Sequence, residues 1–259
     1  MRIALSRPEF DLCWERLALG EHPTVLAIPS HGATARERAA VLADAWDALR
    51  ARGLAGRGGL DPRLAGWLAL LARPDREVDA RLRLDAGPRV RAVAAAGRGR
   101  AVLAVLTAER LLLEEVDEDA LAASVVGLLP PHATPRSRSI SLRAADLERA
   151  AARADRSAAG LEQALREVGL PRQDAGKVAE VLGNVVRMGQ FGAATRPTRP
   201  DGPGRRERGP YAISFYDTPE GRWQFTRRPD DTGQQWSTLS PADHRRLAHA
   251  VAELLAGGR

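Results

Sequence analysis

Hydrophobic residues recur at helical spacing in three stretches of residues 1–72. A capping residue precedes each stretch: Ser6, Thr34 and Asp61. Glutamate follows three positions after the first two, as in a capping box, and proline directly follows the third. The pattern predicts three helices, with an extended segment at residues 25–28 between the first two. The predicted apolar faces comprise Phe10, Cys13, Trp14 and Leu17, then Val41, Leu42, Ala45, Trp46 and Leu49, and finally Leu64, Trp67, Leu68 and Leu71.

From residue 77 onward the period of the pattern changes to two. It predicts strands at residues 77–84, 89–95, 101–106 and 111–116, followed by a helix at 117–129. The turns between these strands are so short that they join only antiparallel neighbours. Glu77 and Asp79 share one strand face with Arg81 and Arg83, so we expect a solvated ladder of ion pairs there, not a catalytic carboxylate pair.

The second half repeats this order of helices, antiparallel strands and a closing helix. The predicted elements are a strand at 139–142, helices at 144–155, 157–168 and 171–187, strands at 188–195, 211–217, 221–227 and 234–238, and a last helix, capped by residues 240–243, that ends at Leu255. We therefore expect one α+β domain over residues 1–259, made of two similar halves, 1–129 and 139–259. Residues 130–138 and 196–210 are rich in Pro and Arg and are predicted to be exposed linkers.

Composition narrows the class of protein. The chain has 259 residues, of which 44% are hydrophobic and 28% are charged, as in ordinary soluble globular proteins. The single cysteine, Cys13, excludes an internal disulfide and a cysteine metal cluster, and its place on a helical apolar face predicts a buried core residue. No apolar run approaches the roughly 20 residues of a membrane span, and the N-terminus does not resemble a secretory signal. We expect a cytoplasmic protein without membrane insertion.

The net charge of +6 is concentrated in one region of the chain. Residues 130–209 hold 15 basic and 9 acidic residues, and the remainder is neutral. Lys177 is the only lysine, so the excess is arginine and indicates a GC-rich genome before it indicates a nucleic-acid partner. The basic stretches lack interleaved aromatic residues for base stacking, which disfavours the alternative of a nucleic-acid-binding regulator. An acidic protein partner would suit the charge.

Catalytic and metal-binding motifs are missing from the sequence. It contains no phosphate-binding glycine loop and no His-Glu-x-x-His motif. His244 and His249 are five positions apart on one predicted helix, which separates them too far for a shared metal. We therefore predict no catalytic residue, no metal and no cofactor. A site assembled from scattered residues such as His22, His31 and Asp79 is the enzymatic alternative.

The five tryptophans fall into two groups. Trp14, Trp46 and Trp67 lie on predicted helical apolar faces and are expected in the core. Trp223 and Trp236 lie in the strand region of the second half, where interface and core roles both stay open.

Several short stretches, in this order and at this spacing, resemble the EspG family of type VII (ESX) secretion chaperones of actinobacteria. They include Glu9-Phe10-Asp11-x-x-Trp14-Glu15, Pro29-Ser30-x-Gly32-x-Thr34-x-x-Glu37-Arg38, Leu71-Ala72-Arg73-Pro74, Gly189-Gln190-Phe191-Gly192, Phe215-Tyr216-Asp217-Thr218-Pro219 and Ser240-Pro241-Ala242-Asp243. The resemblance spans nearly the whole chain. It implies a quasi-twofold α+β fold with a central antiparallel sheet flanked by helical bundles. It also implies a cytosolic, non-catalytic chaperone that binds the hydrophobic tip of PE/PPE-like or other helical-hairpin secretion substrates, keeps them soluble and delivers them.

Such a chaperone needs a partly apolar patch with a polar rim. We expect the patch on the sheet of the second half and on the helix before it, with the candidate residues Val186, Met188, Gln190, Phe191, Phe215, Trp223, Phe225, Arg227 and Arg228. The alternative for Phe191, Phe215 and Phe225 is packing in the core. A homodimer formed through an edge strand also stays open.

Overall fold

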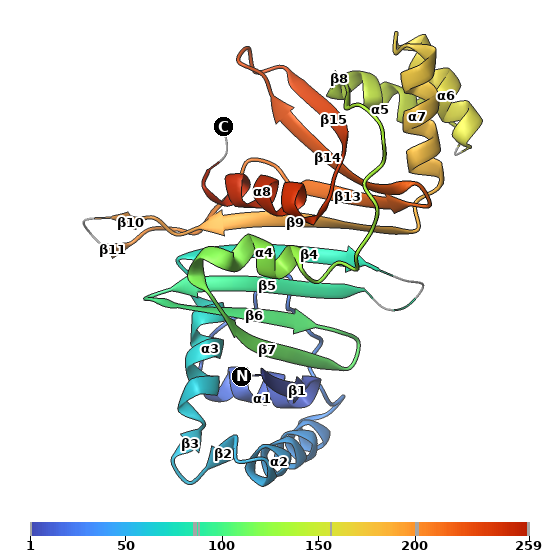
Figure 1. Ribbon diagram of the computed structural model, residues 1–259. Coiled ribbons are helices and arrows are strands. Elements are labelled where there is room, and N and C mark those ends of the chain that lie inside the picture. Colours follow the sequence, from blue (N-terminus) through green and yellow to red (C-terminus); the bar gives the residue numbers. More distant parts are fainter. Residues whose placement is uncertain (1, 85–86, 88, 156, 200–201, 258–259) are drawn as a thin grey trace. The chain divides into compact units, whose positions relative to one another are not determined.

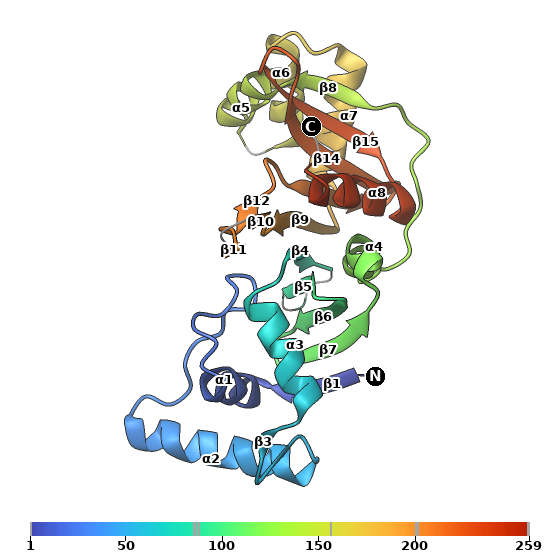
Figure 2. The same cartoon turned by 90° about the vertical axis from the view of Figure 1, so that its left-hand side faces the viewer.

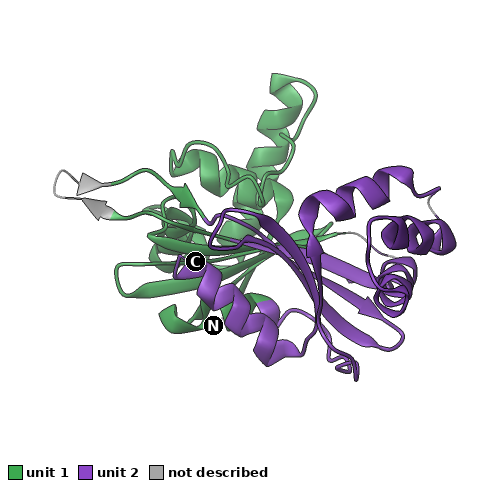
Figure 3. Cartoon of the chain, turned by 90° about the horizontal axis from the view of Figure 1, so that it is seen from above, with its two compact units in different colours: residues 1–81, 88–125, 193–208 green, residues 82–87, 126–192, 209–259 purple. Residues whose placement is uncertain are grey.

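The structure is a computed structural model that describes residues 2–84, 87, 89–155, 157–199 and 202–257; for 198–203, only the backbone is described. The chain divides into two compact units (Figure 3). The first comprises residues 1–81, 88–125 and 193–208, and the second 82–87, 126–192 and 209–259. None of the described helices combines the length and apolar character needed to cross a membrane.

The first unit contains an antiparallel sheet with the strand order β1-β7-β6-β5-β4 and helices packed against it (Figure 1). Its elements are β1 (Arg2–Ser6), α1 (Arg7–Arg16), α2 (Ala35–Ala51), β2 (Ala55–Gly56), β3 (Gly59–Leu60), α3 (Pro62–Ala72), β4 (Arg76–Arg83), β5 (Val90–Gly97), β6 (Arg100–Leu106), β7 (Arg110–Val116), the 3-10 helix η1 (Glu118–Ala120) and α4 (Leu121–Val126); the last residues of β4 and α4 belong to the second unit. The meander β4–β7 confirms the predicted strands.

The predicted capping residues start the first three helices. Ser6 Oγ accepts a hydrogen bond from the backbone N–H of Glu9, and the Glu9 carboxylate accepts one from the backbone N–H of Ser6. Thr34 and Glu37 make the same reciprocal pair, which completes a capping box in each helix. Asp61 Oδ1 accepts from two backbone N–H groups of α3. These local bonds satisfy donors that a helix N-terminus would otherwise leave unpaired.

The core of the first unit lies between its sheet and α1 and α3, and α2 adds Ala45 and Leu49 to it (Figure 2). Phe10, Cys13, Trp14 and Trp67 are buried in it, as predicted. Burial also raises the pKa of the Cys13 thiol to about 12. Trp46 is partly buried and carries the Arg16 guanidinium over its ring, 3.9 Å from the centroid.

The second unit contains the antiparallel strand order β9-β13-β14-β15-β8. Its elements are β8 (Ile140–Arg143), α5 (Ala144–Arg153), α6 (Ala158–Glu167), α7 (Arg172–Gly183), β9 (Arg187–Thr195), β13 (Ile213–Thr218), β14 (Gly221–Pro229), β15 (Gln235–Pro241) and α8 (His244–Leu255); β9 continues into the first unit at residue 193. Figure 3 shows the curved strands with α8 on one side and the helices α5–α7 on the other. Helices and antiparallel strands thus occur together in each unit, as an α+β fold requires.

Several predicted elements differ from the structure. Residues 25–28 are not extended, because a turn places Val25 and Leu26 in the core. Strand β1 was not predicted, although all of its residues pair with β7. Helix α7 ends at Gly183, four residues before its predicted end, and residues 117–129 contain only η1 and the short α4.

The segment 196–210, predicted to be an exposed linker, contains paired strands. Strands β10 (Thr198–Arg199) and β11 (Gly202–Pro203) pair with each other, and β12 (Glu207–Arg208) pairs with the end of β9. Arg206 is bound to the carboxylate of Glu77, and Arg208 Nη2 lies 2.9 Å from Asp79 Oδ2. Residues Glu77 and Asp79 are 6% and 1% exposed, so these acids are not solvated as predicted, although Asp79 pairs with Arg81 at 3.2 Å as the ladder required. Segment 205–208 supplies the buried charges of β4 with their counter-ions.

Candidate functional site

The predicted partner-binding residues lie on adjacent strands of the second unit but not on one surface. Phe215 of β13 is paired with Gly189 of β9, and Tyr216, the next residue of β13, is paired with Met188. Successive side chains of a strand point to opposite faces, so these two rows belong to opposite faces of the sheet. The predicted partner-binding residues are therefore divided between the two faces of the sheet.

One face, which we call the α8 face, is packed against the last helix. Arg228 on this face lies 3.8 Å from Glu253 of α8. Phe191 and Phe215 are fully buried here, with ring centroids 6.0 Å apart. The structure leaves neither phenylalanine accessible to a partner, and core packing is the correct alternative for both.

The other face, which we call the bundle face, is packed against α5–α7. Trp223 is fully buried in the cluster that these helices form with the sheet, so it is a core residue and is not accessible to a partner. Tyr216 and Phe225 pack against the same cluster and are only partly buried. Arg227 Nη2 bonds Glu148 Oε1 of α5 at 2.8 Å, with both side chains largely in solvent. Burial raises the pKa of the Tyr216 hydroxyl.

The bundle face is open at the start of β9. Val186 and Met188 are 54% and 41% exposed, and among the described residues they are the large hydrophobic side chains that lie exposed. Gln190 follows on the same face and is exposed too. We call Val186, Met188, Gln190, Tyr216 and Phe225 the open strip. Solvent-exposed apolar side chains in a row beside half-buried aromatic rings are typical of a protein-binding surface.

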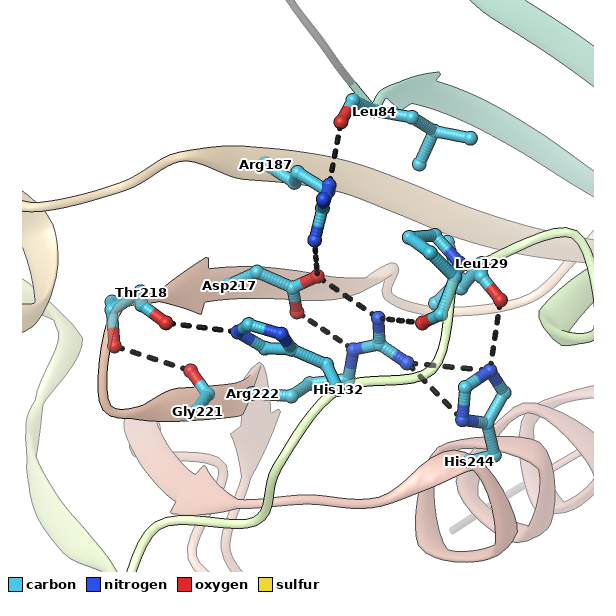
Figure 4. A network of polar contacts seen from close by, with 10 residues as sticks. Leu84, Leu129, His132, Arg187, Asp217, Thr218, Gly221, Arg222 and His244 are labelled. Carbon is cyan, nitrogen blue, oxygen red and sulfur yellow. Dashed lines mark hydrogen bonds and ion pairs between the residues drawn. The ribbon is translucent and has the colours of Figure 1, made fainter.

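A buried ion-pair network on the α8 face connects β9, β13 and β14 (Figure 4). It lies on the side of the sheet opposite to the open strip. Arg222 and Asp217 are both fully buried and form a bidentate pair, with Nε–Oδ1 at 2.7 Å and Nη2–Oδ2 at 2.9 Å. Arg187 adds Nη1 at 3.7 Å from Asp217 Oδ2 and donates from Nε to the carbonyl oxygen of Leu84 at 2.7 Å. The backbone N–H of Val186 donates to the Asp217 carbonyl at 2.8 Å. The start of β9 is thereby held in place on the side away from the open strip.

The same network binds the segment 130–138, which was predicted to be an exposed linker. Arg222 Nη2 donates to the Pro130 carbonyl at 2.9 Å, and His132 Nε2 lies 2.8 Å from the Thr218 carbonyl oxygen. His244 Nε2 lies 3.0 Å from the carbonyl oxygen of Leu129, just before the segment. A carbonyl oxygen only accepts, so both histidines carry a proton on Nε2. These polar contacts hold a segment most of whose residues are exposed, and its role as a linker stays a prediction.

Gly221 allows the segment to lie against the β13–β14 turn. Its φ is +145°, and a Cβ atom at this position would lie 2.6 Å from the carbonyl oxygen of Ala133 and 2.8 Å from Pro135 Cδ. The backbone N–H of Arg222 donates to the same Ala133 carbonyl at 2.8 Å. The close approach therefore requires glycine.

Comparison with known proteins assigns the chain to a family. A sequence model of the EspG family matches residues 6–253. The chain belongs to the EspG family. It is 27% identical over 256 residues to the ESX-3 secretion-associated protein EspG3 of Mycolicibacterium smegmatis, covering 95% of this chain and 84% of that protein. It also matches the solved structure of the Mycobacterium tuberculosis type VII secretion system chaperone EspG5 in complex with a PE25–PPE41 dimer, with a TM-score of 0.73 at 16% identity over 99% of this chain and 96% of that one.

The family assignment confirms the resemblance and the α+β fold predicted from the sequence. At 16% identity the structural match establishes a shared fold and leaves the partner of this EspG-family chain to be argued separately.

Of the residues of the enzymatic alternative, His22 and His31 both interact with Asp11, whereas Asp79 is bound by arginines. His22 packs between aromatic rings, with centroids 4.8 Å from Phe10 and 5.0 Å from Trp14. His31 Nδ1 faces Asp11 at 3.4 Å, and Asp79 is paired with arginines. Within the described part of the chain no group of three or more His, Cys, Asp and Glu is arranged to hold a metal ion. Each of these residues has a structural contact that accounts for it.

A polar hollow of about 390 Å³ lies elsewhere in the first unit, lined by Gly99, Arg100, Ala101, Glu115, Val116, Asp117 and Glu118. It contains none of the three predicted residues and carries no histidine or cysteine.

Sequence reasoning missed Tyr216 as a member of the open strip. Tyr216 directly follows Phe215 in β13, so the two side chains point to opposite faces of the sheet. Since Phe215 belongs to the buried face, the sequence could have placed Tyr216 on the other one. The missed Asp217–Arg222 pair lies across one hairpin at directly opposed positions, which is typical of a cross-strand ion pair.

Proposed function

We propose that this chain is a cytosolic chaperone of a type VII (ESX) secretion system. In this proposal it binds the hydrophobic tip of PE/PPE-like or other helical-hairpin secretion substrates, keeps the tip from aggregating and releases it at the secretion machinery. Membership of the EspG family supports the class. The solved EspG5 complex, in which a chaperone of this fold holds a PE25–PPE41 dimer, supports the kind of client.

The observation that carries the proposal is the exposure of Val186 and Met188 beside the half-buried rings of the open strip. We place the client on this strip, with Gln190 and the Arg227–Glu148 pair as its polar rim. Full burial of a side chain as large as Val or Met is worth roughly 1.5–3 kcal/mol, so a few such contacts give moderate and reversible affinity. Reversibility suits a chaperone that has to release its client.

Co-expression with a helical-hairpin client tests the proposal. The wild-type chain should keep the client in the soluble fraction and co-purify with it, whereas Met188→Glu should lose the complex because a charge would be buried against the apolar tip. Ala39→Glu is the matched control, because it adds the same charge at an exposed position of α2. Equal recovery of client by all three proteins would place the client surface elsewhere.

We propose no catalysis for this chain, because binding and release suffice for the function. The nucleic-acid alternative is weakened, since Arg206 and Arg208 of the Arg-rich segment are paired with Glu77 and Asp79. A homodimer through an edge strand stays a prediction, and gel filtration of the chain alone would test it.

A further inference from the structure

Three arginines gather at one end of the sheet of the first unit. Arg7 starts α1 and donates from Nη2 to the carbonyl oxygen of Thr107 at 2.9 Å. Arg91 lies near the start of β5, directly opposite Leu106, which immediately precedes Thr107. Arg91 Nη1 donates to the carbonyl oxygen of Ala27 at 2.8 Å. Each of these two guanidinium groups is thus held by a neutral backbone acceptor.

Arg81, near the end of β4, is the third member. Its Nη1 lies 3.2 Å from Asp79 Oδ1, but Asp79 also binds Arg208, so one buried carboxylate is shared between two cations. Burial, together with the charges of Arg7 and Arg81, lowers the pKa of Arg91. The three charges repel one another, and a single shared carboxylate does not neutralise them.

No carboxylate among the described residues pairs with Arg7 or Arg91. Both side chains are half-buried, and Nε of Arg7 is buried without a hydrogen-bond partner in the described part of the chain. Burying a cation without a counter-ion is costly, and a backbone carbonyl orients a guanidinium without neutralising it. A bound anion would remove this cost.

We propose that Arg7, Arg81 and Arg91 form a binding site for the carboxylate side chains of an acidic protein segment. A guanidinium group can donate two parallel hydrogen bonds to the two oxygens of one carboxylate. The three guanidinium groups, supplied by α1, β4 and β5, can therefore bind successive acidic side chains of one segment. Charge complementarity favours this partner, because three guanidinium groups with one shared carboxylate leave this site positively charged. The site belongs to the first unit alone and does not depend on the open strip of the second unit.

Fluorescence anisotropy with a labelled oligoglutamate peptide tests the site. Wild-type protein should bind the peptide, and affinity should fall steeply with added salt. Arg7→Gln and Arg91→Gln should each weaken binding by about tenfold, the effect of losing one charge-assisted contact. Arg81→Gln should weaken it as well, and this variant keeps its fold because Asp79 retains Arg208.

Arg36→Gln is the matched control, because it removes one positive charge from an exposed position of α2. Arg91→Lys keeps the charge and should restore part of the affinity. Equal binding by wild type, Arg36→Gln and the three cluster variants would overturn the proposal. Stabilisation of wild type alone by inorganic phosphate, without peptide binding, would also overturn it in favour of a small-anion site. Loss of client binding through Met188→Glu bears only on the proposed chaperone surface, so the two proposals fail separately.

Discussion

At the residue scale, His22 is the clearest case of a polar group placed in an apolar setting. Its ring is stacked on Trp14 and tilted against Phe10, and its Nε2 is buried without a hydrogen-bond partner among the described residues. Burial lowers the pKa of His22 below the ordinary value of 6.5, against the smaller opposing effect of Asp11. The folded protein therefore disfavours the charged ring.

Stability should fall with acidification in a window set by His22. Below pH 6.5 His22 takes up a proton in the unfolded chain but stays neutral in the folded one. The free energy of unfolding therefore decreases until the pH reaches the lower pKa of the folded state. Urea denaturation between about pH 7.5 and about pH 5.5 measures this slope. His22→Phe should flatten it, and an unchanged slope in this variant would contradict the assignment.

The carboxylate of Asp11 titrates in a separate window. Burial raises its pKa, but hydrogen bonds from Arg38 and His31 more than offset this, so the pKa lies below 3.8. Its contribution is therefore present above that value and is lost as the pH falls further.

Asp217→Asn should strongly destabilise the second unit. The substitution leaves Arg222 fully buried without its carboxylate, and removing one partner of a buried ion pair costs about 3–5 kcal/mol. Urea denaturation measures the loss. Arg227→Gln is the control, because its pair with Glu148 is largely in solvent and is worth at most about 1 kcal/mol. Similar losses in both variants would contradict this account of the network.

At the scale of elements, the sequence predicted what is local and missed what is long-range. Capping boxes and period-two alternation depend on residues a few positions apart, and they gave the correct helix starts and the β4–β7 meander. Strand β1 has five residues and is a strand only because it pairs with β7, more than 100 positions away. The exposed part of the candidate site was predicted at Val186 and Met188, whereas the burial of Phe191, Phe215 and Trp223 depends on α8 and α5–α7.

Gly221→Ala tests the contact between the β13–β14 turn and segment 130–138. A Cβ atom there would lie 2.6 Å from the Ala133 carbonyl oxygen at a φ of +145°, so both strain and displacement of the segment are expected, at about 1–3 kcal/mol or more. Gly233→Ala is the control, because its φ of +83° is strained but nothing lies within 4 Å. Thermal melting should separate the two variants, and equal shifts would argue against the contact.

At the scale of the whole molecule, several arginines serve as counter-ions of buried carboxylates. Arginines of the two predicted linkers pair with Glu77 and Asp79 and, through Arg138 Nη2 at 2.6 Å, with Asp174 of α7. The arginine-rich composition therefore contributes directly to tertiary structure. The similarity of the two halves, residues 1–129 and 139–259, stays a prediction that superposing one half on the other would test.

Arg206→Gln should destabilise the first unit, although residue 206 lies far along the chain from β4. Glu77 is 6% exposed and would lose its cation, which costs about 1–3 kcal/mol for a buried charged group left unpaired. Limited proteolysis within residues 196–210 and thermal melting both report the loss. Arg205→Gln changes the same charge next to it and serves as the control, and indistinguishable behaviour of the two variants would contradict the pairing.

The division of the two units along the chain determines when each can be completed during synthesis. The first unit needs residues 193–208, and the second needs residues 209–259. Segment 130–138 leaves the ribosome well before Arg222, the residue that binds it. A nascent chain that has reached residue 190 therefore holds two unfinished units, with apolar strand faces still uncovered. At that stage of synthesis the chain's own apolar surfaces are the ones exposed to aggregation.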